Sequence, residues 1–344
     1  MTVPLTAAIG SYGSDAHGLI CGYLFEPGQP GSPIDSGPAG HWIEQHVEHP
    51  GDSFVWLHFN LANAAAEPWL KSHAGLSDEF FEAFTKGSRS TRIERQDEEL
   101  LAVINDVTFD FAFDASDVAT LWVGVRSRLV VSARRHSLRA VDRLRAAVKG
   151  GEVLATPLSL LDHLLHDQAD ELQHIARAAT ERIDDIEDAM LAGRAERHAG
   201  ELSRLRRLAV RLQRLLAPDP SALNRTIANP PAWLSVADTQ LLLQASEDFA
   251  VVLRDIGALQ ERIKLLQDES SARVAEENNR SLFLLTMVTV LALPINLVAG
   301  LLGMNVGGIP LSNHPHGFWM VVTLIAVFTL GVAVLALRRL GPRR

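Results

Sequence analysis

Two long apolar runs near the C-terminal end dominate the hydrophobic pattern of the chain. The segment 281–337 contains no Asp, Glu, Lys or Arg, and within it residues 281–302 and 318–337 are almost entirely apolar. Each run has about the 20 residues that a helix needs to cross a hydrocarbon core of about 30 Å. The segment 303–317 between them is too rich in Gly and Pro to continue either helix. The pattern predicts a transmembrane hairpin rather than two core helices, since long core helices usually carry a polar face.

The charges that flank the hairpin predict its orientation. Arg280 precedes the first span, four arginines lie in the tail 338–344, and the loop 303–317 has no Lys or Arg. By the positive-inside rule, both chain ends are expected in the cytoplasm and the loop outside. The N-terminus lacks the basic start and long apolar run of a signal peptide. We therefore expect a multi-pass protein of the cell inner membrane, inserted through its C-terminal hairpin.

The first 150 residues alternate short apolar runs with amphipathic segments. Strands are predicted by aromatic and β-branched runs at 18–25, 53–59, 100–107, 118–125 and 129–133. Helices are predicted at 64–72, 77–84 and 138–149, the second of them starting at Ser77. We expect a cytosolic mixed α/β domain over 1–150, and an α+β membrane protein as the fold class. The segment holds no phosphate-binding loop, His-Glu-x-x-His or Gly-x-Ser-x-Gly motif, so we do not expect an enzyme.

The apolar spacing becomes helical after residue 150. A cytosolic helical hairpin is predicted over 151–231, with a helix start at Pro157. Its acidic tract 181–188 and its arginine-rich segment 202–215 are expected to form an antiparallel pair held by surface charges. An acid-tipped hairpin at the mouth of a pore is the functional interpretation of the same pattern.

A stalk helix over 232–280 is predicted to run without a stop signal into the first span. One helix over 232–302 would have 71 residues and a length of about 105 Å at about 1.5 Å per residue. Its apolar stripe, which ends near Leu266, is expected to need other copies of the chain as partners. The sequence therefore predicts a homo-oligomer around an axis.

The net charge and the cysteine count limit which molecules and metal clusters the protein is expected to bind. The net charge is −9, and residues 1–280 hold all 41 acidic but only 28 of the 32 basic residues, a balance of −13 (28 − 41). This balance excludes nucleic acid as the expected partner. A negative net charge suits an inner vestibule that attracts cations, and a negative charge that only keeps the domain soluble is the alternative explanation. The single Cys21 excludes an intramolecular disulfide and a Cys-rich zinc cluster, and it is expected to be a small buried side chain in a reducing cytosol.

Polar residues recur at helical spacing within the first span. Thr289 and Asn296 lie seven residues apart, and a polar group that faces lipid lacks partners, so this face is expected to point inward. Neutral oxygens can hold a hydrated divalent ion through its water shell without binding it too tightly. Hydrogen bonding between neighbouring helices is the alternative role. The predicted pore-lining residues are Asn278, Leu282, Leu285, Thr289, Leu293, Asn296 and Gly300.

The end of the first span carries a family resemblance. Gly303-Met304-Asn305 follows the span directly, and with the upstream Pro294 it resembles the CorA-type family of divalent metal ion transporters. The continuation 306–310, Val-Gly-Gly-Ile-Pro, is more similar to the ZntB branch of proton-coupled zinc transporters. The resemblance implies five subunits, an outer selectivity ring of Gly303, Met304 and Asn305, a regulatory metal site near Asp268 on the stalk, and no cofactor besides the transported ion.

The loop offers two candidate metal ligands, His314 and His316. It contains no carboxylate, and imidazole suits zinc better than magnesium. A histidine near the mouth could also link transport to external pH. Two further histidine groups have less claim on a metal: His163 and His166, which lie beside several aspartates, and the histidines of the loop-like stretch 41–49.

These features together predict a divalent metal ion transporter in membrane lipid, with zinc as the expected cargo and proton coupling as one driving force. A magnesium, cobalt or nickel channel is the alternative within this class. The sequence does not decide whether the protein imports or exports the ion, or whether it is a channel or a symporter. It also does not decide whether the cytosolic domain binds a regulatory metal. A membrane-anchored coiled-coil scaffold or sensor is the alternative of another class, and the polar residues Thr289 and Asn296 at bilayer depth argue against it.

Overall fold

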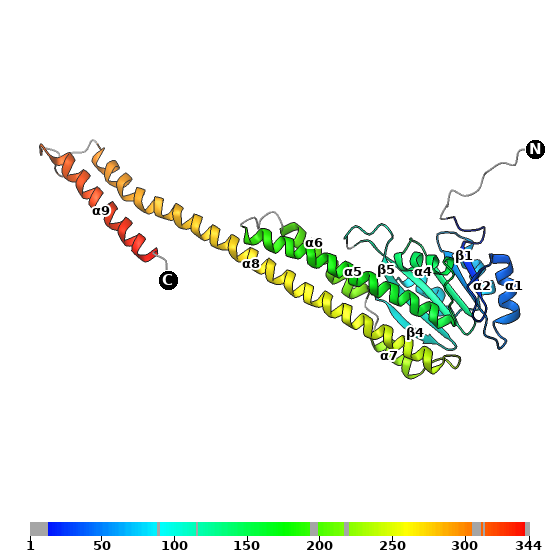
Figure 1. Ribbon diagram of the computed structural model, residues 1–344. Coiled ribbons are helices and arrows are strands. Elements are labelled where there is room, and N and C mark those ends of the chain that lie inside the picture. The colour runs from blue at the N-terminus through cyan, green and yellow to red at the C-terminus, as the bar shows by residue number, and fades with distance from the viewer. Residues whose placement is uncertain are drawn as a thin grey trace, which may run out of the picture. The chain divides into compact units, whose positions relative to one another are not determined.

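The computed structural model describes residues 13–87, 90–114, 116–192, 199–216, 220–304, 311 and 314–340. The chain divides into two compact units, Met1–Gln267 and Asp268–Arg344. The first unit combines a sheet with helices, and the second consists of the end of helix α8 and helix α9 (Figure 1). The long helix α8, Val236–Leu302, contributes residues to both units.

A seven-stranded sheet in the order β2-β1-β3-β7-β6-β5-β4 forms the centre of the first unit. Strands β3 and β7 are parallel, and every other neighbouring pair is antiparallel. The five strands predicted from the sequence are present with small shifts at their ends. The strands are β1 (Leu19–Phe25), β2 (Ser32–Pro33), β3 (Phe54–Asn60), β4 (Arg92–Gln96), β5 (Glu99–Val107), β6 (Val118–Arg126) and β7 (Leu129–Arg134).

Strand β4 was not predicted, because its sequence Arg-Ile-Glu-Arg-Gln has no apolar alternation. Only Ile93 of this strand is buried. Helix α7 (Pro220–Ala228) packs against β4, and its Thr226 hydroxyl donates a hydrogen bond of 3.1 Å to the Ile93 carbonyl. This edge strand is therefore covered by a helix that follows more than 120 residues later in the chain. No local sequence pattern predicts that contact.

Helices α1 (Ser36–His46), α2 (Ala66–His73) and α3 (Asp78–Lys86) share a core with one face of the sheet. The predicted start of α3 is confirmed, since the Ser77 side chain accepts a hydrogen bond from the Phe80 amide at 3.3 Å. The expectation of a loop around His41 and His46 is wrong, because both lie in α1. Burial of Ala39 and Ile43 against the sheet outweighs the weak helix propensity of that segment.

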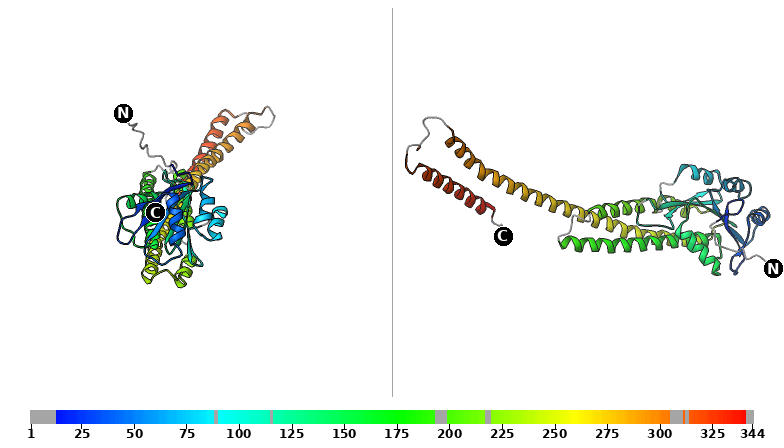
Figure 2. Two further views of the ribbon diagram at one scale, coloured as in Figure 1. Left: turned by 90° about the vertical axis from the view of Figure 1, so that its right-hand side faces the viewer. Right: turned by 90° about the horizontal axis from the view of Figure 1, so that it is seen from above.

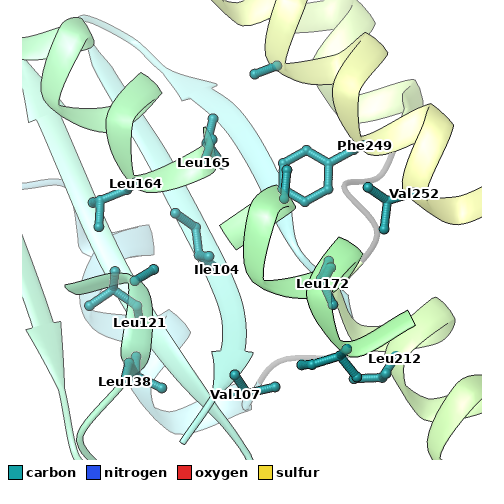
Figure 3. Close-up of a cluster of buried hydrophobic side chains, with 14 of the residues drawn as sticks. Ile104, Val107, Leu121, Leu138, Leu164, Leu165, Leu172, Leu212, Phe249 and Val252 are labelled. Carbon is teal, nitrogen blue, oxygen red and sulfur yellow. The ribbon is translucent and has the colours of Figure 1, made fainter. Parts of the chain in front are cut away.

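The other face of the sheet is covered by α4 (Arg139–Lys149), α5 (Pro157–Leu191), α6 (Ala199–Leu216) and the first part of α8. Helix α5 begins at Pro157 as predicted, with Thr156 and Ser159 forming a reciprocal cap. Figure 3 shows this core, in which Ile104 of the sheet, Leu172 of α5 and Phe249 of α8 belong to one buried cluster.

Helix α8 corrects two expectations. It begins at Val236 rather than at residue 232, because Ser235 and Asp238 cap each other's amides at 3.1 Å. Its apolar stripe does not need another copy of the chain, since it is buried in the core that the same chain forms with α5 and α6. The buried positions are Leu242, Ala245, Phe249, Val252, Ile256, Leu259, Ile263 and Leu266.

The charge pairing between α5 and α6 also differs from expectation. Asp184 and Glu187 of the acidic tract both pair with Arg262 of α8, the first at 2.6 Å. Helix α6 joins the core through its leucines, including Leu205 and Leu212, which are 3% exposed. Apolar packing against α5 and α8, rather than a ladder of surface charges, therefore accounts for the position of α6 among the described residues.

In the second unit, α9 (Gly317–Leu340) runs back antiparallel to the end of α8 (Figure 2). Helix α8 is long and apolar enough to cross a membrane, and no residue of its most apolar window is buried. Helix α9 contains a shorter apolar stretch, Gly317–Val332, within the described residues. Both apolar runs of the sequence are thus helical, and most of their described side chains are exposed in the single chain.

Candidate ion pathway

The exposed positions of α8 opposite the core share a seven-residue spacing with several of the predicted pore-lining residues. The buried positions of α8 recur every seven residues, as in Leu242, Phe249, Ile256 and Ile263. Successive seventh residues of a helix lie near one line, with a drift of about 20° per heptad. The line opposite the core runs through Glu247, Arg254, Glu261 and Asp268, all of them exposed, and continues by the same step to Leu282, Thr289 and Asn296.

The predicted stripe in the first span shares this seven-residue spacing, although in a straight helix the drift of about 20° per heptad would turn the line by about 140° between Glu247 and Asn296. We refer to the line Glu247, Arg254, Glu261, Asp268, Ala275, Leu282, Thr289, Asn296 and Gly303 as the outward line. The sequence analysis did not single out Glu247, Arg254 and Glu261. A seven-residue period of charged positions opposite a buried apolar period is the signal that could have found them.

The side chains of the stripe are available to water or to another copy. Leu282, Leu285 and Leu293 are 61%, 65% and 66% exposed. The Thr289 hydroxyl donates to the Leu285 carbonyl at 2.9 Å, which leaves its oxygen free to accept hydrogen bonds. The Asn296 side chain is exposed and has no hydrogen-bond partner within the described part of the chain. Neutral oxygens that accept from the water shell of a cation are thus present on this face.

The Gly-Met-Asn motif lies at the very end of α8. The Gly303 amide donates to the Ala299 carbonyl at 2.9 Å, and a side chain at position 303 would approach that carbonyl to 3.0 Å. A glycine therefore allows the backbone to close the last turn of the helix tightly. The Met304 side chain is 49% exposed. Asn305 lies outside the described residues, so its predicted place in a selectivity ring stays a prediction.

His314 and His316 are close to each other, and both are exposed. Their rings are 6.2 Å apart, and the His316 amide donates to Nδ1 of His314 at 3.2 Å. Because Nδ1 accepts this bond, the neutral His314 ring carries its proton on Nε2 and presents a donor there. A metal at Nε2 would require the other tautomer and the loss of this bond. The predicted ligand role of these two histidines stays a prediction.

No group of three or more His, Cys, Asp or Glu side chains among the described residues could hold a metal ion. A metal at the loop histidines would need water or another copy of the chain as a further ligand. Asp268 is exposed on the outward line, and its predicted regulatory role is likewise not decided by the single chain. A metal at Asp268 would likewise need ligands from water or from other copies of the chain.

The histidines of α5 make ion pairs instead. Nε2 of His163 lies 3.1 Å from Glu152, and Nδ1 lies 3.0 Å from Asp167. These carboxylates raise the pKa of His163 to about 9, with the Asp167 hydrogen bond as the largest cause. A charged imidazole with both nitrogens occupied does not bind a metal. His166 is 3.7 Å from Asp248 of α8.

A buried series of hydrogen bonds links strands β3 and β7 around His58. Arg134 donates to Nε2 of His58 at 3.0 Å, so Nδ1 carries the proton and donates to the Ser132 hydroxyl at 2.8 Å. Trp56 Nε1 donates to the same hydroxyl at 2.8 Å. Burial and the neighbouring Arg134 lower the pKa of His58 well below its usual value. This series of hydrogen bonds satisfies buried polar groups and holds β3 against β7.

Comparison with known proteins agrees with this architecture. The family model described as CorA-like Mg2+ transporter protein matches residues 51–339. The divalent cation transporter CmaX of Pseudomonas aeruginosa is 30% identical over 273 residues, which cover 79% of this chain and 82% of that protein. The zinc transport protein ZntB of Pectobacterium carotovorum is 24% identical over 278 residues, covering 81% and 85%.

Solved structures show the same fold. The structure of full-length CmaX superposes with a TM-score of 0.76 at 27% identity, covering 93% of this chain and 98% of that one. The CorA magnesium transporter of Methanocaldococcus jannaschii superposes with a TM-score of 0.71 at 19% identity, over the same shares of the two chains. With its mixed α/β domain, long helix and apolar C-terminal helices, the chain belongs to the CorA-like Mg2+ transporter family of divalent cation transporters, a family of membrane transporters and not of enzymes.

Proposed function

We propose that copies of this chain assemble into a membrane pore for divalent cations, with the first span, 281–302, lining its axis. The outward line of α8 is the observation that carries the proposal. Its cytosolic part faces away from the core of its own chain, and its membrane part holds Thr289 and Asn296. If α8 helices supercoil around a common axis, this seven-residue line stays inward, which brings Thr289, Asn296 and Leu282 of the copies to the axis. The apolar side chains on the remaining faces of the span then face lipid.

The pathway would conduct a hydrated ion. Its described side chains are neutral within the span, and it would begin in the cytosol at rings of Glu261 and Asp268. Acidic rings raise the local cation concentration, and neutral oxygens above them let the ion leave again. Both chain ends would be cytoplasmic, as the flanking arginines predict, and five copies is the number that the family resemblance implies.

Zinc is the cargo that we favour. The loop between the spans has two imidazoles and no carboxylate, and the ZntB proteins, which are named as zinc transporters, are similar over 81% of this chain. A membrane potential supplies about 2.3 kcal/mol per elementary charge per 100 mV, and a coupled proton is the other source. Magnesium, cobalt or nickel conduction is the second candidate, since CmaX is named only as a divalent cation transporter.

Cysteine crosslinking in a Cys21→Ser background tests the assembly. Asn296→Cys should join neighbouring subunits readily, because this position would face the axis. Val327→Cys, on an exposed position of α9, should crosslink hardly at all. The reverse pattern would exclude a pore lined by the first span. The Asn296→Cys protein, before crosslinking, is also placed in liposomes. If it assembles but shows no divalent cation flux, the non-conducting scaffold is favoured instead.

A further inference from the structure

A continuous apolar groove separates the end of α8 from the start of α9. A cavity of about 670 Å3 is lined by Val298 and Leu302 of α8, by Phe318 of α9 and by His314. A second cavity of about 530 Å3 lies between Ile295 and the α9 segment that ends at Leu330. The two cavities share Val322 and Ile325, so they form one groove along the helix pair, here named the hairpin groove.

The hairpin groove is polar at one end only. The His314 ring at that end presents its Nε2 proton, because Nδ1 accepts the His316 amide. Helix α9 begins beside it at Gly317. The amides of Gly317 and Met320 donate to the carbonyls of His314 and His316 at 3.0 and 3.1 Å, so the first amides left without a backbone acceptor among the described residues are those of Phe318 and Trp319, which carry partial positive charge. The segment 281–337 has no acidic residue. This end therefore suits an anion, while the remaining wall, apart from Thr329, is apolar.

The groove is long enough to cross the hydrocarbon layer of one leaflet of a bilayer. Along α9 it extends from Gly317 to Leu330, which is about 20 Å at about 1.5 Å per residue. One leaflet contributes about half of a hydrocarbon core of about 30 Å. A phosphate at the His314 end and an acyl chain along the groove therefore fit both its chemistry and its extent.

We propose that the hairpin groove binds one glycerophospholipid from the leaflet that the loop faces, with the phosphate held by His314 Nε2 and the amides of Phe318 and Trp319. The acyl chain lies between Ile295 and Ile325. The inference rests on the membrane insertion in the proposed function, but not on ion conduction. The other possible occupant of an apolar groove is a helix from a second copy of the chain.

Native mass spectrometry of the full chain in detergent tests this site. The probes are phosphatidylglycerol and a diacylglycerol with the same acyl chains. Ala326→Trp fills the groove, and Val327→Trp adds the same bulk at a neighbouring position that lines neither cavity. His314→Ala removes the phosphate donor, and His316→Ala removes the neighbouring imidazole, which lines neither cavity.

We expect wild type to retain phosphatidylglycerol at least tenfold more tightly than the diacylglycerol. Ala326→Trp and His314→Ala should weaken that binding at least fivefold, whereas both control variants should resemble wild type. Equal retention of the two lipids, or unchanged binding in both groove variants, would overturn the proposal. Loss of the oligomer in Ala326→Trp alone, without any bound lipid in wild type, would assign the groove to a second copy. Because the readout is lipid retention, an absence of ion flux would count against the pore and not against this site.

Discussion

The two parts of helix α8 differ in how their apolar side chains are covered, although they belong to one continuous helix. Between residues 236 and 267 its apolar stripe is buried in the core with α5 and α6, and Phe249 and Ile263 are 2% and 0% exposed. Between residues 281 and 302, Leu282, Leu285 and Leu293 are more than 60% exposed. The first unit thus forms its own hydrophobic core, and the apolar surface of the second unit is left for lipid and for other copies.

The two faces of α8 therefore have different roles, the buried one in stability and the exposed one in the proposed ion pathway. Burying a leucine or phenylalanine side chain stabilises a fold by about 1.5–3 kcal/mol, so the cytosolic stripe of α8 is a structural element. The outward line contributes no such burial in the single chain, although it carries the polar groups of the proposed pathway. Substitutions on the two faces of the same helix should therefore have different consequences.

The largest expected effect lies at the outer end of the outward line. Asn305→Ala should abolish divalent cation flux, with a loss of more than tenfold, because a ring of oxygen acceptors for the hydrated ion disappears. Ion-selective flux into liposomes measures it. Val327→Ala, on an exposed position of α9, is the control and should keep its flux, and size-exclusion chromatography should show intact assembly in both. Normal flux in Asn305→Ala would remove this residue from the mechanism.

The buried face predicts a large effect on stability. Phe249→Ala should lower the free energy of unfolding by about 3–5 kcal/mol, because it leaves a cavity among α5, α6 and α8. Val251→Ala, on a side chain that is 47% exposed, should change it by less than about 0.5 kcal/mol. Denaturant unfolding of the full chain in detergent compares the two. Equal losses would show that the outward face is also part of a folding core.

The loop histidines should affect ion choice more modestly. We expect the double variant His314→Ala with His316→Ala to weaken zinc flux several-fold and to leave magnesium flux nearly unchanged, since imidazole binds zinc and magnesium prefers oxygen. If magnesium passes as well as zinc and the variant matches wild type, the cargo is magnesium.

The smallest expected effect concerns His163 of α5, which is not on the outward line. Its pKa of about 9 lies above the usual 6.5, so its ion pairs stabilise the fold fully below about pH 6.5. That contribution is lost as the pH rises through 9, because the folded state then gives up its proton. His163→Gln should lower the melting temperature by about 2 °C at pH 6 and hardly at all at pH 10. His166→Gln is the control, and a shift independent of pH would exclude titration as the cause.

The sequence alone predicted the features that depend on local pattern. The lengths of the apolar runs predicted two helical spans, and short aromatic and β-branched runs predicted five strands. Ser77 and Pro157 marked helix starts that the structure confirms. The family resemblance, which the comparisons confirm, came from the motif after the first span. Residue spacing determines these features because they depend on neighbours within a few turns or strands of the chain.

Only the tertiary structure decided which surface covers which. It showed that α7 covers the edge strand β4, that Arg262 pairs with the acidic tract, and that the apolar stripe of α8 is buried by its own chain. The same burial identifies the opposite face of α8 as the one left open. These outcomes depend on segments that are distant in sequence, and hydrophobic burial has no direction, so an apolar stripe requires a partner without specifying which one.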